Sequence, residues 1–158
     1  MFKFLKKKGV DNDFYAFAKG TVVTLDKVPD QVFAQKLMGD GFAIELIEGK
    51  IYAPVSGELK VVFPTGHAYG IETKAGLSIL IHIGIDTVEL DGKGFLIKVK
   101  QGDTVKRGDL LAEVDLDYLK DKNKPTITPL IFTSGEKIKL LSENKTVTKD
   151  DKNLFEFI

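Results

Sequence analysis

The chain contains only two histidines, His67 and His82, and both lie in one glycine-rich stretch. Imidazole can act as a nucleophile, as a general acid or base, or as a metal ligand near neutral pH. Two imidazoles in one site could therefore hold a metal ion or pass on a phosphoryl group. The glycines around them would leave room for a second polypeptide backbone to approach.

His82 belongs to an apolar run that predicts a strand over residues 77–83. Side chains of a strand alternate between its two faces. One parity is apolar throughout and predicts a core face: Leu77, Ile79, Ile81, Ile83 and Ile85. His82 then points to the other face, beside Leu80. The strand alone leaves two interpretations open, a reactive imidazole with an apolar rim or a half-solvated histidine without a role.

His67 follows a turn that contains Pro64 and Gly66, and Thr65 comes two residues before it. In an extended chain Thr65 and His67 lie on one side. The Thr65 hydroxyl can then hold one imidazole tautomer and leave the other ring nitrogen for a substrate. The alternative is a turn histidine without a function.

The choice between a metal and a phosphoryl group depends on the available partners. A zinc site takes three or four protein ligands, and with no cysteine it would need carboxylates such as Asp86 or Glu89. A phosphoryl site needs a nucleophile and hydrogen-bonding groups at the phosphoryl oxygens. His82 as acceptor, with His67 and Thr65 nearby, meets that requirement. Because no nucleotide-binding P-loop is present, we expect another protein to be the phosphoryl donor.

The composition sets broader limits. The 158 residues suit one domain, which we expect over residues 16–158, after a flexible N-terminal segment at 1–15. A formal net charge of zero argues against a nucleic-acid binder. Without cysteine, disulfides and thiol catalysis are excluded, and a cytoplasmic location fits. No apolar run is long enough for a membrane span. The lysine-rich residues 1–8 suit a frayed terminus or a weak contact with anionic lipid.

The rest of the chain consists of short apolar strands separated by Gly, Pro, Asn and Asp, which predicts an all-β antiparallel sandwich or barrel. One or two short helical turns are expected. The first covers residues 30–38, with Asp30 as its N-cap and Gly39 as its stop, and the second covers residues 115–122. The segment 53–59 echoes the segment 16–22, as a duplicated β-hairpin unit would.

The residues around the histidines form a specific pattern. Thr65-x-His67 is followed by His82-x-Gly84-Ile85-Asp86-Thr87-Val88 and then by Leu90-x-Gly92-x-Gly94-Phe95. This pattern resembles the glucose-class IIA protein of the phosphoenolpyruvate-dependent sugar phosphotransferase system. The resemblance extends from about residue 16 to the C-terminus. It implies an antiparallel β-sandwich or barrel of duplicated hybrid motifs.

The resemblance also implies a function. His82 would accept a phosphoryl group through Nε2 from the histidine phosphocarrier HPr and pass it to a cysteine of the IIB domain of a sugar permease, which drives sugar uptake with phosphorylation. His67 would stabilise the phosphoryl group, and Thr65 would orient His67. The Gly84 carbonyl would fix the His82 tautomer, and Asp30 and Asp86 would flank the site.

An apolar docking surface for these partners is implied at seven positions: Val32, Phe33, Leu37, Met38, Phe63, Leu80 and Val88. Two residues depart from the family pattern. Phe17 stands where proline is expected in the repeat, and Leu80 replaces an aromatic residue on the docking face. No cofactor is required, although His67 and His82 could share a zinc ion with a partner carboxylate. Regulatory targets beyond HPr and IIB stay open.

Two other classes of protein share features with this sequence. Lysostaphin-type zinc peptidases have a related β-architecture, but they need a further His-x-His pair where this chain has His82-Ile83-Gly84. A swinging-arm carrier is suggested by Asp26-Lys27-Val28, which is similar to a lipoyl attachment triplet. Metal analysis and intact mass, respectively, would identify these two classes.

Overall fold

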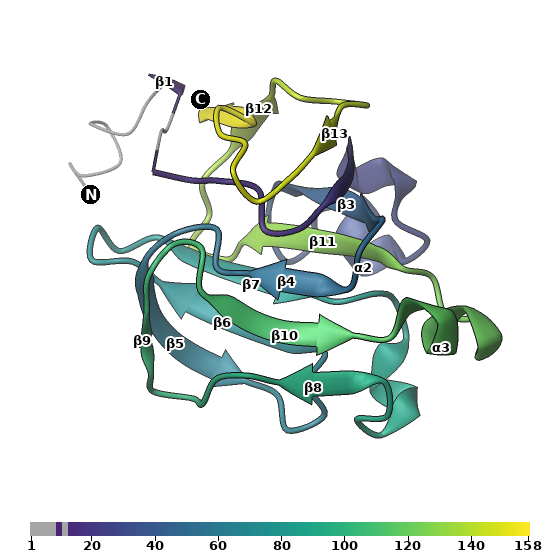
Figure 1. The fold of residues 1–158 in the computed structure, drawn as a ribbon. Coiled ribbons are helices and arrows are strands. Elements are labelled where there is room, and N and C mark those ends of the chain that lie inside the picture. Colours follow the sequence, from purple (N-terminus) through teal and green to yellow (C-terminus); the bar gives the residue numbers. More distant parts are fainter. Residues whose placement is uncertain (1–8, 11–12) are drawn as a thin grey trace.

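The structure is a computed structural model that describes residues 9–10 and 13–158. It consists of short strands joined by tight turns and short helices (Figure 1). In chain order these elements are β1 (Gly9–Val10), β2 (Gly20–Val23), η1 (Leu25–Lys27), α2 (Gln31–Ala34), β3 (Gly41–Leu46), β4 (Lys50–Tyr52), β5 (Gly57–Val62), β6 (Ala68–Glu72), β7 (Ser78–His82), η2 (Thr87–Leu90), β8 (Phe95–Ile97), β9 (Thr104–Val105), β10 (Leu110–Val114), α3 (Leu116–Asp121), β11 (Ile127–Phe132), β12 (Ile138–Leu140), β13 (Thr146–Val147) and β14 (Phe155–Phe157).

The strands pair antiparallel in a large sheet and two small ones. The large sheet has the order β13-β2-β3-β11-β7-β6-β5-β9, and the small sheets are β4-β10-β8 and β1-β14-β12. Because β13 and β9 are the two ends of the large sheet, it does not close on itself. The sheet β4-β10-β8 lies over it (Figure 1). The predicted all-β antiparallel fold is confirmed, and of the two predicted forms the sandwich is the correct one.

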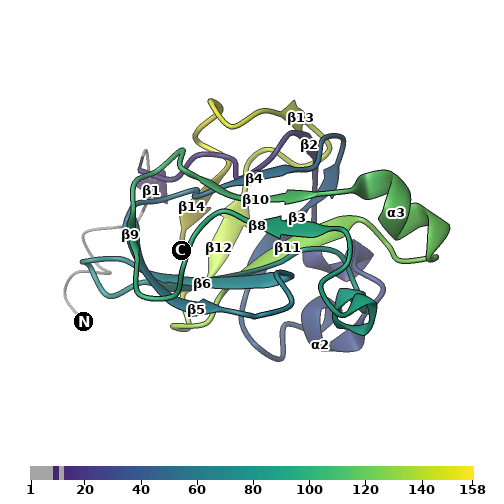
Figure 2. The same cartoon turned by 60° about the horizontal axis from the view of Figure 1, so that its bottom comes forward.

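The two faces of β7 point into two separate apolar clusters. Ile79 belongs to the main core, together with Ile51 of β4. Leu80 packs against a smaller outer cluster that contains Phe33 of α2. Figure 2 shows α2 on the side of the large sheet away from β10 and β8. The alternation predicted from the sequence therefore separates a deep core from an outer face that is only partly covered.

Ile85 does not follow the predicted core face. The residues of its parity from Leu77 to Ile83 belong to the main core, but Ile85 is part of the outer cluster. The strand ends at His82, and Gly84 turns the chain with a φ of 69°. Strand alternation therefore stops before Ile85 is reached.

The large sheet contains a structural repeat. Gly20 pairs with Val147 at the start of β2, just as Gly57 pairs with Val105 at the start of β5. A Cβ atom would lie 2.2 Å from the Glu45 carbonyl oxygen at Gly20, and 2.5 Å from the corresponding Glu72 oxygen at Gly57. Only glycine allows this close strand contact. The echo between residues 16–22 and 53–59 thus reflects a duplicated unit.

Phe17 occupies the place of Pro54 in this repeat. The Tyr52 amide donates to the Phe17 carbonyl at 2.7 Å, and the Tyr15 amide donates to the Pro54 carbonyl at 2.9 Å. Phe17 is fully buried and packs near Phe42. The departure from proline therefore leaves the reciprocal backbone exchange intact and adds an aromatic ring to the core.

The short helices differ in length from their predictions. Asp30 caps α2 as expected, since its carboxylate accepts a hydrogen bond from the Val32 amide at 2.8 Å. The helix ends at Ala34 rather than Met38, because Lys36 adopts a left-handed conformation with φ 59°. The second helix, α3, lies within the predicted range. Five short elements were not predicted from the sequence: β1, η1, η2, β9 and β13.

The N-terminal boundary needs a correction. Phe14, assigned above to the flexible segment, is buried at 3% exposure and packs edge-on against Phe132 and Phe155. The fold therefore begins before residue 16. Residues 1–8, predicted to be either a frayed terminus or a weak lipid contact, lie outside the described part of the chain. Among the described residues, none of the helices is long and apolar enough to cross a membrane.

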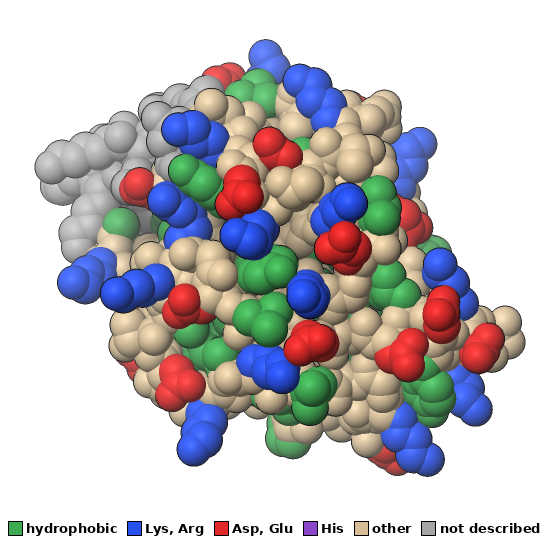
Figure 3. Space-filling view, viewed as in Figure 1, with side chains coloured by type: hydrophobic (Ala, Val, Ile, Leu, Met, Phe, Trp, Pro, Cys, Tyr) green, Lys and Arg blue, Asp and Glu red, His purple; other side chains and the backbone are tan. Residues whose placement is uncertain are grey.

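The surface carries a mixed charge pattern. On the face shown in Figure 3, lysines and acidic residues are interspersed with apolar side chains. This arrangement agrees with the zero formal net charge of the sequence. The described residues of this face thus present no continuous basic track of the kind that binds nucleic acid.

Candidate functional site

The two histidines come together because β6 and β7 are neighbours. Ala68 pairs with His82 across the two strands, and the Ile83 amide donates to the His67 carbonyl at 2.6 Å. This register brings the imidazole rings to a centroid distance of 5.1 Å, with an interplanar angle of 75°. Both rings therefore belong to one site on the outer face of the large sheet.

The His82 ring is held in one orientation and one tautomer. Its Nδ1 lies 2.7 Å from the carbonyl oxygen of Gly84. A carbonyl oxygen can only accept, so Nδ1 carries the proton and Nε2 keeps its lone pair. The Phe33 ring packs beside the imidazole at a centroid distance of 5.2 Å. The half-buried His82 side chain is thus a preoriented nucleophile.

The Gly84 carbonyl is positioned by a tightly packed turn. A Cβ atom at Gly84 would lie 2.7 Å from Thr87 Cγ2 and 2.8 Å from the Pro125 carbonyl oxygen, and φ is 69°. The Gly84 amide donates to the Thr128 hydroxyl at 3.2 Å, and the Thr87 hydroxyl donates to the Ile83 carbonyl at 2.6 Å. Only glycine fits here, and its carbonyl direction is fixed by these neighbours.

His67 is buried at 2% exposure. Its Nδ1 lies 2.7 Å from the Thr65 hydroxyl, and the Phe63 ring packs against it with a centroid distance of 5.1 Å. A hydroxyl can donate or accept, so Thr65 can hold either neutral tautomer of His67. When the hydroxyl donates, the proton of His67 resides on Nε2 and is available to an oxygen in the site.

Both imidazoles are neutral at pH 7. Burial, and to a smaller extent the neighbouring His82, lower the pKa of His67 to about 4. Burial also lowers the pKa of His82, against the opposing effects of the Gly84 carbonyl and of the Asp30 and Asp86 carboxylates. The neutral state leaves the Nε2 lone pair of His82 free to attack an electrophile.

Asp30 and Asp86 flank the site from two different helices. Asp30 is the N-cap of α2, and Asp86 precedes η2 in a left-handed conformation with φ 59°. Both carboxylates favour positive charge on His82. They can therefore stabilise a cationic imidazole and attract a basic partner.

Most of the predicted docking surface is exposed. Five of its seven residues are between 40% and 68% exposed. These are Val32, Leu37, Met38, Phe63 and Val88. Leu80 is partly buried on the outer cluster. Phe33 is only 6% exposed and packs beside the His82 ring, so it offers a partner less surface than the other predicted docking residues.

Sequence reasoning missed the residues that hold the Gly84 turn, namely Thr128 and Pro125. Thr128 is fully buried and lies 44 positions away from Gly84. A buried threonine must find a hydrogen-bond partner, but its position in the sequence does not say where. Only the pairing of β11 with β7 brings the two together.

Metal binding by this chain alone is not supported by the ligands present. In the described residues, no three or more His, Cys, Asp or Glu side chains converge on one point. The two histidines supply two nitrogen ligands, whereas catalytic zinc takes three protein ligands. A zinc ion shared with a partner carboxylate stays a prediction.

Comparison with known proteins decides the family. Residues 12–138 match the family described as phosphoenolpyruvate-dependent sugar phosphotransferase system, EIIA 1. The chain belongs to this family. The EIIA family is a phosphotransferase component of sugar transport, and membership in it is consistent with a transferase role for this chain. The predicted resemblance is confirmed.

Individual relatives agree with this assignment. The chain is 49% identical over 139 residues to the PTS system glucose-specific EIICBA component of Streptococcus pneumoniae serotype 4, a match that covers 88% of this chain. It covers only 19% of that relative, which is a much longer protein. The glucose permease IIA from Mycoplasma capricolum superposes with a TM-score of 0.84 at 43% identity, over 90% of this chain and 93% of that one.

These findings favour the EIIA interpretation over the two alternatives. The described residues contain no cluster of side chains that could serve as the zinc ligands of a peptidase. Lys27, the candidate attachment lysine of a swinging arm, is the last residue of the short helix η1. The site at His67 and His82 is therefore the candidate centre of phosphoryl transfer.

Proposed function

We propose that this EIIA chain accepts a phosphoryl group on His82 from phospho-HPr and passes it to a cysteine of the IIB domain of a sugar permease. The observation that carries the proposal is the hydrogen bond from His82 Nδ1 to the Gly84 carbonyl at 2.7 Å. It leaves Nε2 unprotonated, in a ring whose centroid lies 5.1 Å from that of His67. The reaction would take place in the cytoplasm and drive sugar uptake.

The first step is a transfer between two imidazoles. The Nε2 lone pair of His82 forms a bond to phosphorus, while the bond between phosphorus and the HPr imidazole breaks and its electron pair returns to that ring. The His82 ring then carries a positive charge, and its Nδ1–H still donates a hydrogen bond to the Gly84 carbonyl. That carbonyl and the carboxylates of Asp30 and Asp86 favour positive charge on the ring. The same groups therefore stabilise the phosphorylated state.

His67 supports the transferred group. As a neutral ring with Nε2–H, it can donate a hydrogen bond to a phosphoryl oxygen without introducing a proton that competes with the nucleophile. The Thr65 hydroxyl at 2.7 Å from Nδ1 supports this tautomer by donating to it. In the second step, the IIB thiolate attacks phosphorus, and the electron pair of the broken nitrogen–phosphorus bond returns to His82 Nε2.

The partners would approach over the exposed apolar rim. This rim consists of exposed apolar side chains, which would lose their contact with water when a partner binds. They are Val32, Leu37, Met38, Phe63 and Val88. HPr and IIB would use this rim in turn, because each must reach the same Nε2 atom. Other regulatory partners and a shared zinc ion stay open at this surface.

A phosphorylation assay tests the proposal. The purified chain is incubated with phosphoenolpyruvate, enzyme I and HPr, and the acid-labile adduct is quantified by intact mass. We expect one phosphoryl group per wild-type chain and none on His82→Ala. Ile131→Val serves as a buried control and should be labelled normally. An adduct on His82→Ala, or an unlabelled wild-type chain, would contradict the proposal.

Two further variants separate acceptance from donation. His67→Gln should accept a phosphoryl group but donate it to IIB far more slowly, because the stabilising ring is lost. Thr65→Val should slow donation by about tenfold, since the hydroxyl that orients His67 is gone. Both rates come from quenched transfer to a purified IIB domain. Donation at the wild-type rate by His67→Gln would exclude a role of His67 in the transfer.

A further inference from the structure

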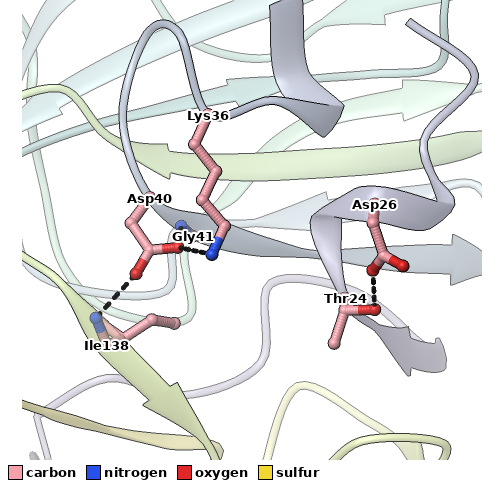
Figure 4. Close-up of polar contacts among 6 residues, drawn as sticks. All are labelled: Thr24, Asp26, Lys36, Asp40, Gly41 and Ile138. Carbon is pink, nitrogen blue, oxygen red and sulfur yellow. Dashed lines mark hydrogen bonds and ion pairs between the residues drawn. The ribbon is translucent and has the colours of Figure 1, made fainter. Parts of the chain in front are cut away.

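The Asp40 carboxylate has polar contacts with three residues, Lys36, Gly41 and Ile138 (Figure 4). Its Oδ1 accepts from the Gly41 amide at 2.8 Å and lies 3.3 Å from Lys36 Nζ. Its Oδ2 accepts from the Ile138 amide at 2.9 Å. The Asp40 side chain is only 13% exposed. Both carboxylate oxygens thus have partners, one of them on β12 in a different sheet.

The segment before Asp40 needs such an anchor. After α2, the Leu37 amide donates to the Val32 carbonyl and the Lys36 amide donates to the Phe33 carbonyl, both at 3.0 Å. This is the Schellman ending of a helix, which requires a left-handed residue. Lys36 adopts that conformation without being glycine, at a cost of about 1 kcal/mol. The ending is therefore strained at Lys36 and depends on contacts elsewhere.

This ending displays two of the most exposed apolar side chains of the docking surface. Leu37 is 68% exposed and Met38 is 44% exposed. The helix that precedes them is only four residues long, too short to be stable by itself. On one side the segment is held by the Asp30 cap, and on the other by the contacts of Asp40. Lys36 is tied directly to Asp40 across one turn.

We propose that Asp40 is a positioning residue that holds segment 36–38 in the orientation in which Leu37 and Met38 meet the partner protein. The inference rests on the proposed function for its partner. Removal of the Asp40 carboxylate detaches the segment from the Ile138 amide and from Lys36. The docking side chains then sample more orientations, and ordering them on binding opposes association. The chemistry at His82 is unaffected, because Asp40 does not touch its ring.

The first test measures the segment without any partner. Amide hydrogen exchange is followed by NMR in Asp40→Ala, Asp40→Asn and a control, Asp26→Asn. Asp26 accepts a hydrogen bond from the Thr24 hydroxyl (Figure 4). The charge of Lys36 also acts on its carboxylate, as it does on that of Asp40. We expect the Leu37 and Gly39 amides to exchange about tenfold faster in Asp40→Ala. Asp40→Asn, which keeps one acceptor oxygen, should recover part of the protection, and Asp26→Asn should match the wild type.

The second test measures docking. The KM for this chain in its phosphorylation by phospho-HPr should rise about fivefold in Asp40→Ala, while kcat changes less than about twofold. Hydrolysis of phosphorylated His82 should keep its wild-type rate. A variant that merely unfolded would lose kcat and the phosphorylated fraction together. Partial rescue by Asp40→Asn separates anchoring from loss of folded protein.

The outcomes are distinct. Unchanged exchange at Leu37 and Gly39 in Asp40→Ala overturns the inference, whatever the phosphorylation assay gives. Faster exchange with an unchanged KM also overturns it, because the segment would then be held without serving docking. A wild-type chain that HPr does not phosphorylate overturns the proposed function, while the exchange result still decides whether Asp40 anchors the segment.

Discussion

In the half of the large sheet that carries the site, His67 precedes β6 and His82 ends β7. In the repeated half, Asp40 precedes β3, and Ile131 lies beside it on β11. The backbone is equivalent: the Ile83 amide donates to the His67 carbonyl, and the Phe132 amide donates to the Asp40 carbonyl. Ala68 pairs with His82, as Gly41 pairs with Ile131. One arrangement of strands thus supports the proposed reactive pair in one half and a structural pair in the other.

The difference lies in the connections between the strands. In the repeated half, residues 24–40 connect β2 to β3 and include η1 and α2. Leu25, Val28 and Phe33 of this connection belong to the same outer cluster as Ile131. In the site half, β5 connects to β6 through the short turn 63–67. Nothing in that turn is long enough to cover His82. A short connection therefore leaves the sheet open at the position where the nucleophile lies.

Alanine substitutions at the two equivalent positions, Ile131 and His82, should have the largest effects, one on stability and the other on phosphorylation. Ile131→Ala should lower the free energy of unfolding by about 2–5 kcal/mol, because a fully buried side chain leaves a cavity. It should still accept a phosphoryl group. His82→Ala should lose phosphorylation at a smaller cost in stability, since its side chain is only partly buried. Urea unfolding and intact mass measure the two properties. Equal destabilisation by both variants would contradict the comparison.

The residues two positions further along should respond differently to alanine. Gly84→Ala should cost about 2–4 kcal/mol, because its left-handed backbone and the close Thr87 and Pro125 atoms exclude a Cβ. Thr133→Ala should change stability by less than about 0.5 kcal/mol, because Thr133 is exposed and its amide still donates to the Ser78 carbonyl. Only the solvent-exposed hydrogen bond from its hydroxyl to the same carbonyl, at 3.3 Å, is lost. Thermal unfolding of both variants tests this. If Gly84→Ala unfolds at the wild-type temperature, the turn must relax enough to accept a Cβ atom, which would contradict the prediction.

The site half should also have its own pH dependence. The pKa of His67 is lowered from 6.5 to about 4, so between these values the unfolded chain binds a proton that folded His67 does not. The folded state therefore loses stability as pH falls from about 6.5 to 4, by about 1–3 kcal/mol, with little further loss from this group below pH 4. The lowered pKa of His82 acts in the same direction.

His67→Gln removes the contribution of His67 while the carboxylates and His82 stay in place. We expect the stability of wild type relative to this variant to decrease between pH 7 and pH 4, as measured by urea unfolding. A difference that is independent of pH would show that folded His67 titrates normally, and that the site is wetter than its burial indicates.

The sequence could predict features that depend on local patterns. Strand alternation placed Ile79 and Ile81 in the core and His82 outside it, and the Asp30 cap marked the start of α2. The motif from Thr65 to Val88 identified the family. These predictions succeeded because side-chain parity and capping involve neighbours within a few residues.

Other features depended on contacts that local patterns do not contain. Phe33 was expected on the docking surface, but it is buried beside the His82 ring. Ile85 left the core face because a left-handed glycine ended the strand. Phe14 was assigned to a flexible segment, yet its ring packs against Phe132 and Phe155, which come from the far end of the chain.

By itself, the sequence determined that one strand carries a histidine away from the core, followed at two positions by glycine. That is a property of residue order and of the two-residue period of a strand. Only the tertiary structure decided that this histidine meets His67, packs beside Phe33 and keeps the Nε2 lone pair free. These contacts join α2, the turn before β6 and the end of β7, and they form only when the sheet has fixed the register between strands and packed the turn at Gly84.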